Sequence, residues 1–143
     1  MRWFAIAVLM VQLICMTACN TQVDTSKVTY QMDVEFVQEM FPKFKDVKST
    51  KYSYIAEQER GIDSIGLVPT YFEGVVFVDE EYCNKLYESY RWEKCNQKIP
   101  AELFEQECDL LYNYNFSHKF NNGYVGEMYF CREFNMIYFD IED

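Results

Sequence analysis

The residues best suited to acid–base chemistry in this chain are His118, its one histidine, and Glu127. An imidazole beside a carboxylate can transfer protons near neutral pH. Ser64 does not supply a nucleophile, because its surroundings, GIDSIG, lack the G-x-S-x-G spacing and the flanking strand and helix of a nucleophile elbow. A histidine at the rim of the core with a satisfying partner is therefore the interpretation that we favour over a hydrolase site.

Six cysteines are the next candidates for chemistry, and they fall into two groups. Cys15 and Cys19 lie in or beside an apolar N-terminal run, and the other four lie in the body of the chain. An even number of cysteines in an exported domain predicts two disulfides. Their spacing lacks the close cysteine pairs of a zinc site, so we expect no metal and no cofactor. The four cysteines of the body are Cys83, Cys95, Cys108 and Cys131.

The N-terminal run covers residues 3–18, follows a single positive charge at Arg2, and ends in Met16-Thr17-Ala18-Cys19. A membrane-spanning helix needs about 20 apolar residues, whereas a secretory signal has a charged start, a shorter apolar region and small residues at its end. Residues 1–20 resemble the lipobox signal of bacterial lipoproteins. The resemblance implies cleavage before Cys19 and lipidation of that residue. An ordinary cleaved signal and an uncleaved anchor are the alternatives.

This resemblance divides the chain into three parts. Residues 1–18 would be the lipoprotein signal peptide, residues 19–29 a polar tether from the lipidated cysteine, and residues 30–143 a single globular domain. A multi-chain lipid on Cys19 would hold the domain durably at the cell membrane or outer membrane, facing outside the cytoplasm.

The charge is strongly negative, with 23 Asp and Glu against 13 Lys and Arg and a net charge of −10. The acidic residues concentrate in the C-terminal body, as in DEE (79–81) and AELFEQECD (101–109). Nucleic acid is therefore not expected as a partner. Such a charge favours solubility, and it can also steer association with a basic partner.

Periodicity and punctuation predict the elements of the N-terminal half. Asp33 and Pro42 bound a predicted helix with an apolar stripe. Residues 50–57 and 70–78 read as strands, the second of them central, with a loop at 60–69 between them. Asp79 is expected to cap a helix with the apolar stripe Tyr82, Cys83, Leu86, Tyr87 and Tyr90, and Pro100 to start a shorter one.

The C-terminal third alternates apolar and polar residues from 110 to 120, which is typical of a half-buried strand. Asn122-Gly123 predicts a tight hairpin that places His118 opposite Glu127. Residues 136–142 form the next strand, which follows a three-residue loop. The predicted fold is α+β, with an antiparallel sheet of about five strands, a C-terminal three-strand meander and helices packed on one face. In this register we favour the disulfides Cys83–Cys131 and Cys95–Cys108.

The stretch YESYRW contributes the candidate binding residues Tyr87, Tyr90, Arg91 and Trp92, with Trp92 as an exposed anchor. The leading interpretation is a small acidic envelope lipoprotein that acts as a non-enzymatic, inhibitor-like or immunity-like binding domain for a protein partner, for instance a basic one. A carbohydrate-binding module is the alternative, and a hydrolase using His118 and Glu127 is a weaker one.

Overall fold

A computed structural model describes residues 28–56 and 70–143 of the protein. The expected signal peptide, Cys19, most of the tether and the expected loop at 60–69 lie outside the described residues. Within these two ranges, no helix combines the length and apolar character needed to cross a bilayer.

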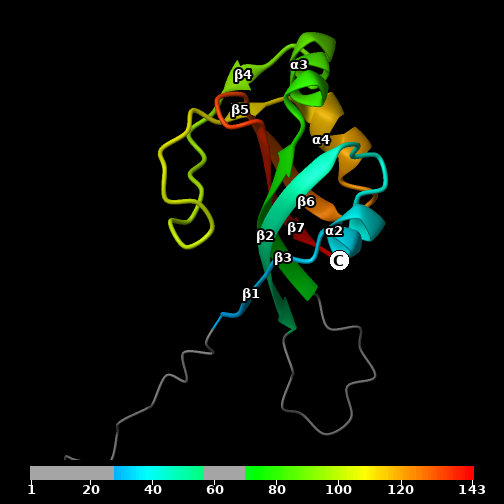
Figure 1. The fold of residues 1–143 in the computed structure, drawn as a ribbon, viewed down its shortest axis with the longest axis vertical. Coiled ribbons are helices and arrows are strands. Elements are labelled where there is room, and N and C mark those ends of the chain that lie inside the picture. The colour runs from blue at the N-terminus through cyan, green and yellow to red at the C-terminus, as the bar shows by residue number, and fades with distance from the viewer. Residues whose placement is uncertain (1–27, 57–69) are drawn as a thin grey trace, which may run out of the picture.

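Residues 28–56 and 70–143 form one sheet of seven strands in the order β1-β2-β3-β7-β6-β5-β4, with every neighbouring pair antiparallel (Figure 1). The mixed α+β class is therefore as predicted, but the sheet has seven strands rather than five. The long strands are β2 (Val47–Ala56), β3 (Thr70–Val78), β6 (Val125–Cys131) and β7 (Met136–Glu142). The strands β1 (Tyr30–Gln31), β4 (Glu93–Lys94) and β5 (Leu111–Tyr112) have two residues each.

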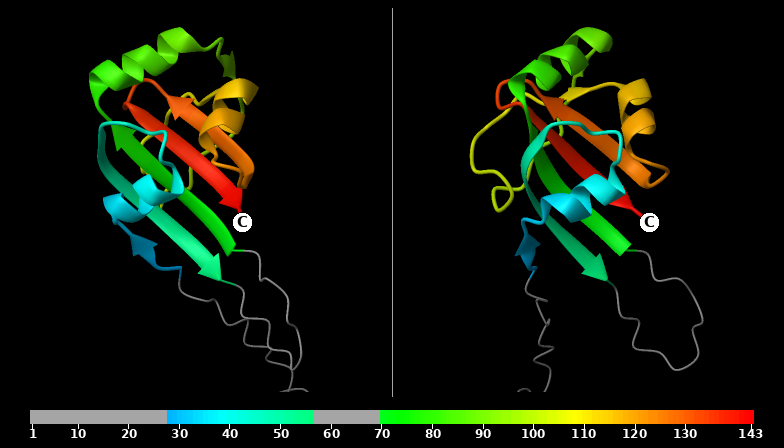
Figure 2. Two further views of the ribbon diagram at one scale, coloured as in Figure 1. Left: turned by 90° about the vertical axis from the view of Figure 1, so that its right-hand side faces the viewer. Right: turned by 45° about the vertical axis from the view of Figure 1, so that its right-hand side comes forward.

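The helices of the described part are α2 (Val34–Met40), α3 (Glu80–Ser89) and α4 (Tyr114–Phe120). They do not form one layer over the sheet as expected. The helices α2 and α4 lie beside the long strands, whereas α3 crosses the end of the sheet at which β3 finishes (Figures 1 and 2).

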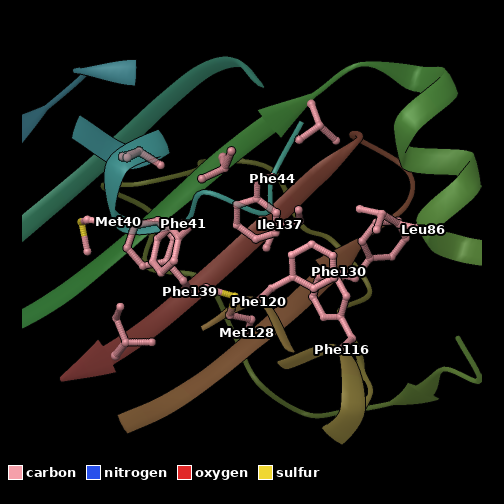
Figure 3. Packing of buried hydrophobic residues seen from close by; sticks show 14 of the residues in the cluster. Met40, Phe41, Phe44, Leu86, Phe116, Phe120, Met128, Phe130, Ile137 and Phe139 are labelled. Carbon is pink, nitrogen blue, oxygen red and sulfur yellow. The ribbon is translucent and has the colours of Figure 1, made fainter. Parts of the chain in front are cut away.

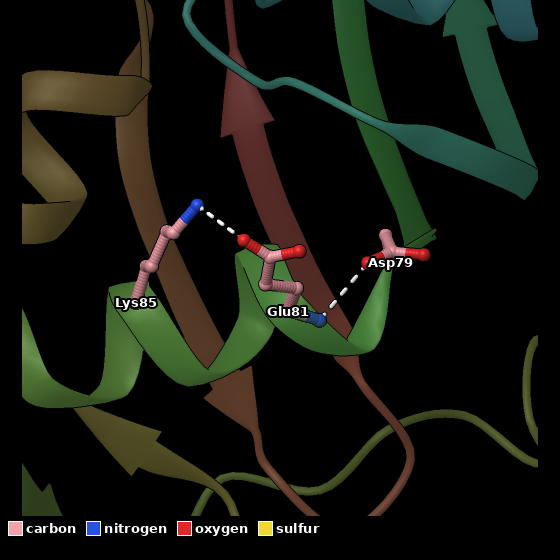
Figure 4. Close-up of polar contacts among 3 residues, drawn as sticks. All are labelled: Asp79, Glu81 and Lys85. Carbon is pink, nitrogen blue, oxygen red and sulfur yellow. Dashed lines mark hydrogen bonds and ion pairs between the residues drawn. The ribbon is translucent and has the colours of Figure 1, made fainter.

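Two of the three predicted helix starts are confirmed, because Asp33 and Asp79 each cap a helix as the sequence pattern requires. The Asp33 carboxylate accepts a hydrogen bond from the Phe36 amide at 3.1 Å, and Asp79 accepts one from the Glu81 amide at 2.9 Å. Lys85 then pairs with Glu81 one turn later at 2.7 Å (Figure 4). These local bonds satisfy amides that a helix N-terminus leaves without intrahelical partners.

A first buried cluster fills the space between the sheet and the helices (Figure 3). Aromatic rings dominate it, and many pack edge-to-face or stacked, as Phe41 does on Phe139 at 5.0 Å. We call this side of the sheet the helix face. Its cluster contains residues from all three helices and four long strands, including Val37, Met40, Phe41, Cys83, Leu86, Phe116, Phe120, Tyr52, Phe72, Val76, Met128, Phe130, Ile137, Phe139 and Ile141.

The strand predicted for residues 110–120 is wrong over most of its length. Only Leu111–Tyr112 pairs in the sheet, and α4 follows, because Asn113 caps it by accepting from the Phe116 amide at 2.9 Å. Phe116 and Phe120 lie one turn apart and are both buried, so the same apolar residues fit a helix as well as a strand.

The turn at Asn122-Gly123 does have left-handed backbone angles, with φ of 55° and 91°. It joins α4 to β6, however, and not two strands. The following hairpin of β6 and β7 is confirmed, although Cys131 pairs with Met136 across four residues and not the three expected.

The outer edge of β6 is only partly paired. The strand β5 covers Tyr129 and Phe130, and beyond it the buried Ser117 hydroxyl of α4 accepts the Met128 amide at 3.0 Å.

The opposite side of the sheet carries a second, smaller cluster under the segment that joins β4 to β5. Pro100 begins one helical turn there, since its carbonyl accepts from the amides of Leu103 and Phe104, but no longer helix follows. The buried members of the cluster are Val75, Leu103, Leu110, Tyr129, Cys131, Met136 and Tyr138.

The predicted disulfide pairing is wrong. The structure links Cys108 to Cys131, with 6.4 Å between the Cα atoms, and leaves Cys83 and Cys95 as the free cysteines of the described part. The physical reason is the side of the sheet: Cys131 belongs to the second cluster, whereas Cys83 on α3 belongs to the helix face.

Candidate functional site

Trp92 does not form the exposed anchor that the sequence predicted. Its ring stacks on Phe130 at 4.7 Å and meets the edge of Phe116 at 5.0 Å. Its indole N–H donates to the Tyr87 carbonyl at 2.9 Å. Trp92 is therefore half-buried and packs against the core of the helix face.

The other residues of YESYRW do not form an open aromatic platform either. Tyr87 and Tyr90 are half-buried against the same cluster, and Arg132 lies over the Tyr87 ring at 4.0 Å. Arg91 is exposed. The structure thus brings these residues together, but mainly as packing at the end of α3.

The predicted hairpin pairing of His118 with Glu127 is wrong as well. His118 lies on the exposed side of α4, where it stacks on Tyr114 at 5.9 Å. Glu127 lies on β6, pairs in register with Asp140, and accepts a hydrogen bond from Tyr129.

Glu127 instead belongs to a row of three carboxylates that crosses the sheet. Asp140 of β7 is the register partner of Glu73 on β3 and of Glu127 on β6. Because neighbouring strands lie about 4.8 Å apart, the row places three acidic side chains within roughly 10 Å. Like charges directly opposite each other destabilise a sheet. We call Glu73, Asp140 and Glu127 the carboxylate row.

Each carboxylate of the row accepts a hydrogen bond from a tyrosine on the same side of the sheet. Tyr138 donates to Glu73 and Tyr129 to Glu127, both at 2.6 Å, and Tyr71 donates to Asp140. These bonds fix the direction of the carboxylates but bring no positive charge to them.

The tyrosines keep their protons over the physiological range. The hydrogen bond to Asp140 is the main cause that raises the pKa of Tyr71 to about 12. Burial, followed by the bonds to Glu73 and Glu127, raises the pKa of Tyr138 and of Tyr129. Burial also raises the pKa of Glu73, although the Tyr138 bond opposes this shift.

No cation of the described residues neutralises the carboxylate row. The ion pairs of this part of the chain join Lys48 to Asp79, Lys85 to Glu81 and Lys94 to Asp109. Within residues 28–56 and 70–143, no three or more side chains of the types His, Cys, Asp or Glu are arranged to hold a metal ion. The row therefore presents negative charge that its described surroundings leave uncompensated.

A shallow hollow of about 220 Å³ adjoins the row. Tyr71 and Val125 form its apolar wall and are 40% and 71% exposed, and Glu142 lies between them in the register. At Gly126, with a φ of 121°, any Cβ would lie 2.3 Å from the Asp140 carbonyl, so only glycine allows this close strand contact. Aromatic rings beside carboxylates are suited to a lysine or arginine side chain.

Sequence reasoning missed this site, although a signal was present. Three strands each carry a tyrosine and an acid two residues apart: Tyr71 and Glu73, Glu127 and Tyr129, Tyr138 and Asp140. Residues two apart on a strand share a face. The pattern gave no strand order, and only the order β3-β7-β6 brings the three pairs together.

Among known proteins, no protein-family model, curated protein or solved structure matches the chain.

Proposed function

We propose that the protein is a small, lipid-anchored domain of the cell envelope that binds a basic protein without catalysing a reaction, in the manner of an inhibitor or immunity protein. One observation carries the binding proposal: a carboxylate row held in place by tyrosines and left without a cation in the described part of the chain. The lipobox resemblance of residues 1–20 supports the anchor.

The shape of the site favours a protein over a single ion. Its charges spread across three strands, so they fit several lysine or arginine side chains rather than one coordination sphere. Tyr71 and Val125 add exposed apolar area, and tyrosine is enriched in interface hot spots. Complementary charge would also speed the encounter with a basic partner.

The alternatives are less well supported. A carbohydrate platform loses its expected anchor, because Trp92 packs against Phe130 and Phe116. A hydrolase site loses its expected couple, because His118 and Glu127 lie on different elements and are not register partners.

The binding proposal is tested by crosslinking in intact envelopes, with the full chain as bait. The triple variant E73Q/D140N/E127Q should lower recovery of a basic partner at least about tenfold, which corresponds to about 1.4 kcal/mol. The control E80Q/E81Q/E88Q removes the same charge from exposed positions of α3. It should lower the recovery of the partner less than about twofold. Equal losses in the two variants would show an effect of net charge alone and contradict the proposal.

The anchor is tested separately. The variant Cys19→Ala should move the protein from the membrane fraction to the soluble fraction and abolish lipid labelling. Unchanged fractionation would refute the lipobox interpretation while leaving the carboxylate row untouched.

A further inference from the structure

Residues 96–109 form a strap over the side of the sheet that faces away from α2 and α4 (Figure 1). The two ends of the strap are held together, because both the Cys95 amide and the Cys95 thiol donate to the Leu110 carbonyl, at 3.2 and 3.4 Å. A compact loop with neighbouring ends and its own packed side chains is an Ω-type loop.

The non-covalent contacts that hold the strap on the sheet are mainly apolar, and Ile99, Leu103 and Phe104 provide them. Lys94 of β4 also pairs with Asp109 at the end of the strap, at 3.6 Å. Leu103 is buried, and Phe104 contacts Phe134 at 4.9 Å and Phe77 at 5.9 Å. The Lys51 ammonium donates to the Glu102 carbonyl. The covalent link is the disulfide between Cys108 on the strap and Cys131 on β6.

Electrostatic repulsion opposes these contacts. The strap contains one basic residue, Lys98, and four acidic residues, so its net charge is −3. The acidic residues are Glu102, Glu105, Glu107 and Asp109. The strap packs in one cluster with Tyr138, which donates to Glu73 of the carboxylate row. After burial, the charges of Asp140 and then Glu102 raise the pKa of Glu73, so the strap and the row interact unfavourably.

We propose that the Cys108–Cys131 disulfide is a redox latch that holds an acidic strap against an acidic sheet face, and that a dithiol reductant releases the strap while the rest of the domain stays folded. Release would uncover Val75, Met136 and Tyr138, which adjoin the carboxylate row. The disulfide would thus control the extent of the open surface beside the candidate binding site. The inference stands whether or not the partner is basic.

The chemistry is a balanced thiol–disulfide exchange. Cys108 is half-buried whereas Cys131 is fully buried, so Cys108 is the more accessible residue of the pair and the expected point of attack. A thiolate of the reductant bonds to the Cys108 sulfur, the bond to Cys131 breaks, and Cys131 leaves as a thiolate that takes up a proton. The second thiol of the reductant then displaces Cys108 as a thiol. The reductant ends as a disulfide, having given two electrons to the protein.

The test is limited proteolysis by a glutamate-specific protease, with and without dithiothreitol. The strap offers the cleavage sites Glu102, Glu105 and Glu107, and α3 offers Glu80, Glu81 and Glu88 as internal controls. Reduction should raise the cleavage rate in the strap at least about tenfold, because the protease needs an unfolded segment, and leave the rate in α3 within about twofold. An unchanged rate in the strap would overturn the proposal.

A parallel rise at the α3 sites would overturn it too, because the disulfide would then stabilise the whole domain. The variant C108S/C131S should reproduce the reduced pattern without reductant. If that variant does not fold, the reduced wild type still decides the question through amide hydrogen exchange at Leu103 and Phe104 against Leu86. The control C83S/C95S keeps the latch and lacks the two free thiols found within residues 28–56 and 70–143, and it should respond to dithiothreitol as the wild type does.

Discussion

The two sides of the sheet are built from the same strands and differ sharply in chemistry. In β7, Ile137, Phe139 and Ile141 enter the aromatic cluster of the helix face, while the alternate residue Tyr138 contacts Glu73 on the other side. The buried cluster of the helix face is built from apolar and aromatic side chains. The opposite side passes from a covered apolar cluster to the uncompensated carboxylate row.

Under the proposed function, this difference separates the side of the sheet that stabilises the fold from the side that binds a partner. Burial of rings on the helix face supplies the free energy that folds the domain. Three carboxylates in register oppose folding, which is consistent with the binding role that we propose for them. Substitutions on the two sides should therefore have different sizes and different pH dependence.

The largest effect is expected from Phe130→Ala on the helix face. Phe130 is fully buried and stacks on Trp92, so its loss leaves a cavity and should lower the free energy of unfolding by about 3–5 kcal/mol. Urea denaturation of the wild type and the variant measures this change in the free energy of unfolding. The neighbouring variant Tyr129→Phe, on the opposite side, keeps its ring and should cost only about 1 kcal/mol. Similar losses in the two variants would remove the distinction between the faces.

A smaller effect is expected from Gly74→Ala in the middle of β3. An added Cβ would lie 2.5 Å from the Tyr52 Cβ and 2.6 Å from the Phe139 ring, so the variant overfills the helix face. We expect a loss of about 1–3 kcal/mol in the free energy of unfolding. The double variant Gly74→Ala/Phe139→Leu should lose less stability than the sum of the two single variants, because the smaller side chain makes room for the added Cβ. A loss equal to that sum would show that the two residues do not compete for space.

The smallest effect, with the opposite sign, is expected from Glu73→Gln. The amide that replaces the carboxylate would still accept from Tyr138 and would relieve repulsion by Asp140. At pH 7 the variant should therefore be more stable than the wild type by up to about 1 kcal/mol.

The pH dependence of this gain identifies its cause. The pKa of Glu73 is raised in the folded state, so the folded protein binds this proton more tightly than the unfolded chain does. Wild-type stability should fall as the pH rises from the ordinary carboxyl pKa of about 4.3 through the raised value. The advantage of the variant should therefore vanish near pH 4, as judged by urea midpoints. An advantage of equal size at pH 4 and pH 7 would place its cause elsewhere, and Glu88→Gln on α3 controls for net charge.

Local signals in the sequence predicted the elements that local bonds determine. Asp33, Pro42 and Asp79 bound α2 and α3 within a residue or two, because caps and a proline act on the adjacent turn. Residues 70–78 were predicted as a strand and form β3 with the same limits. The segment at 110–120 failed, because Phe116 and Phe120 fit periods of two and of four, and the Asn113 cap decided for the helix.

Non-local features could not be predicted in the same way. The disulfide partner of Cys131 depends on which side of the sheet each cysteine occupies, and this follows from strand register. The candidate site depends on β7 inserting between β3 and β6. Glu127 was named from the sequence with a histidine as its partner, whereas its hydrogen-bond partner is Tyr129.

The Ser117 hydroxyl that accepts the Met128 amide has a consequence for self-association. A sheet margin with unpaired amides is a template on which a second chain can add a strand and begin to aggregate. At Met128 a side-chain oxygen from a helix occupies the position that an incoming backbone carbonyl would need. The helix thus satisfies the Met128 amide where β5 ends, and this removes one pairing position that an added strand would use along the margin of β6.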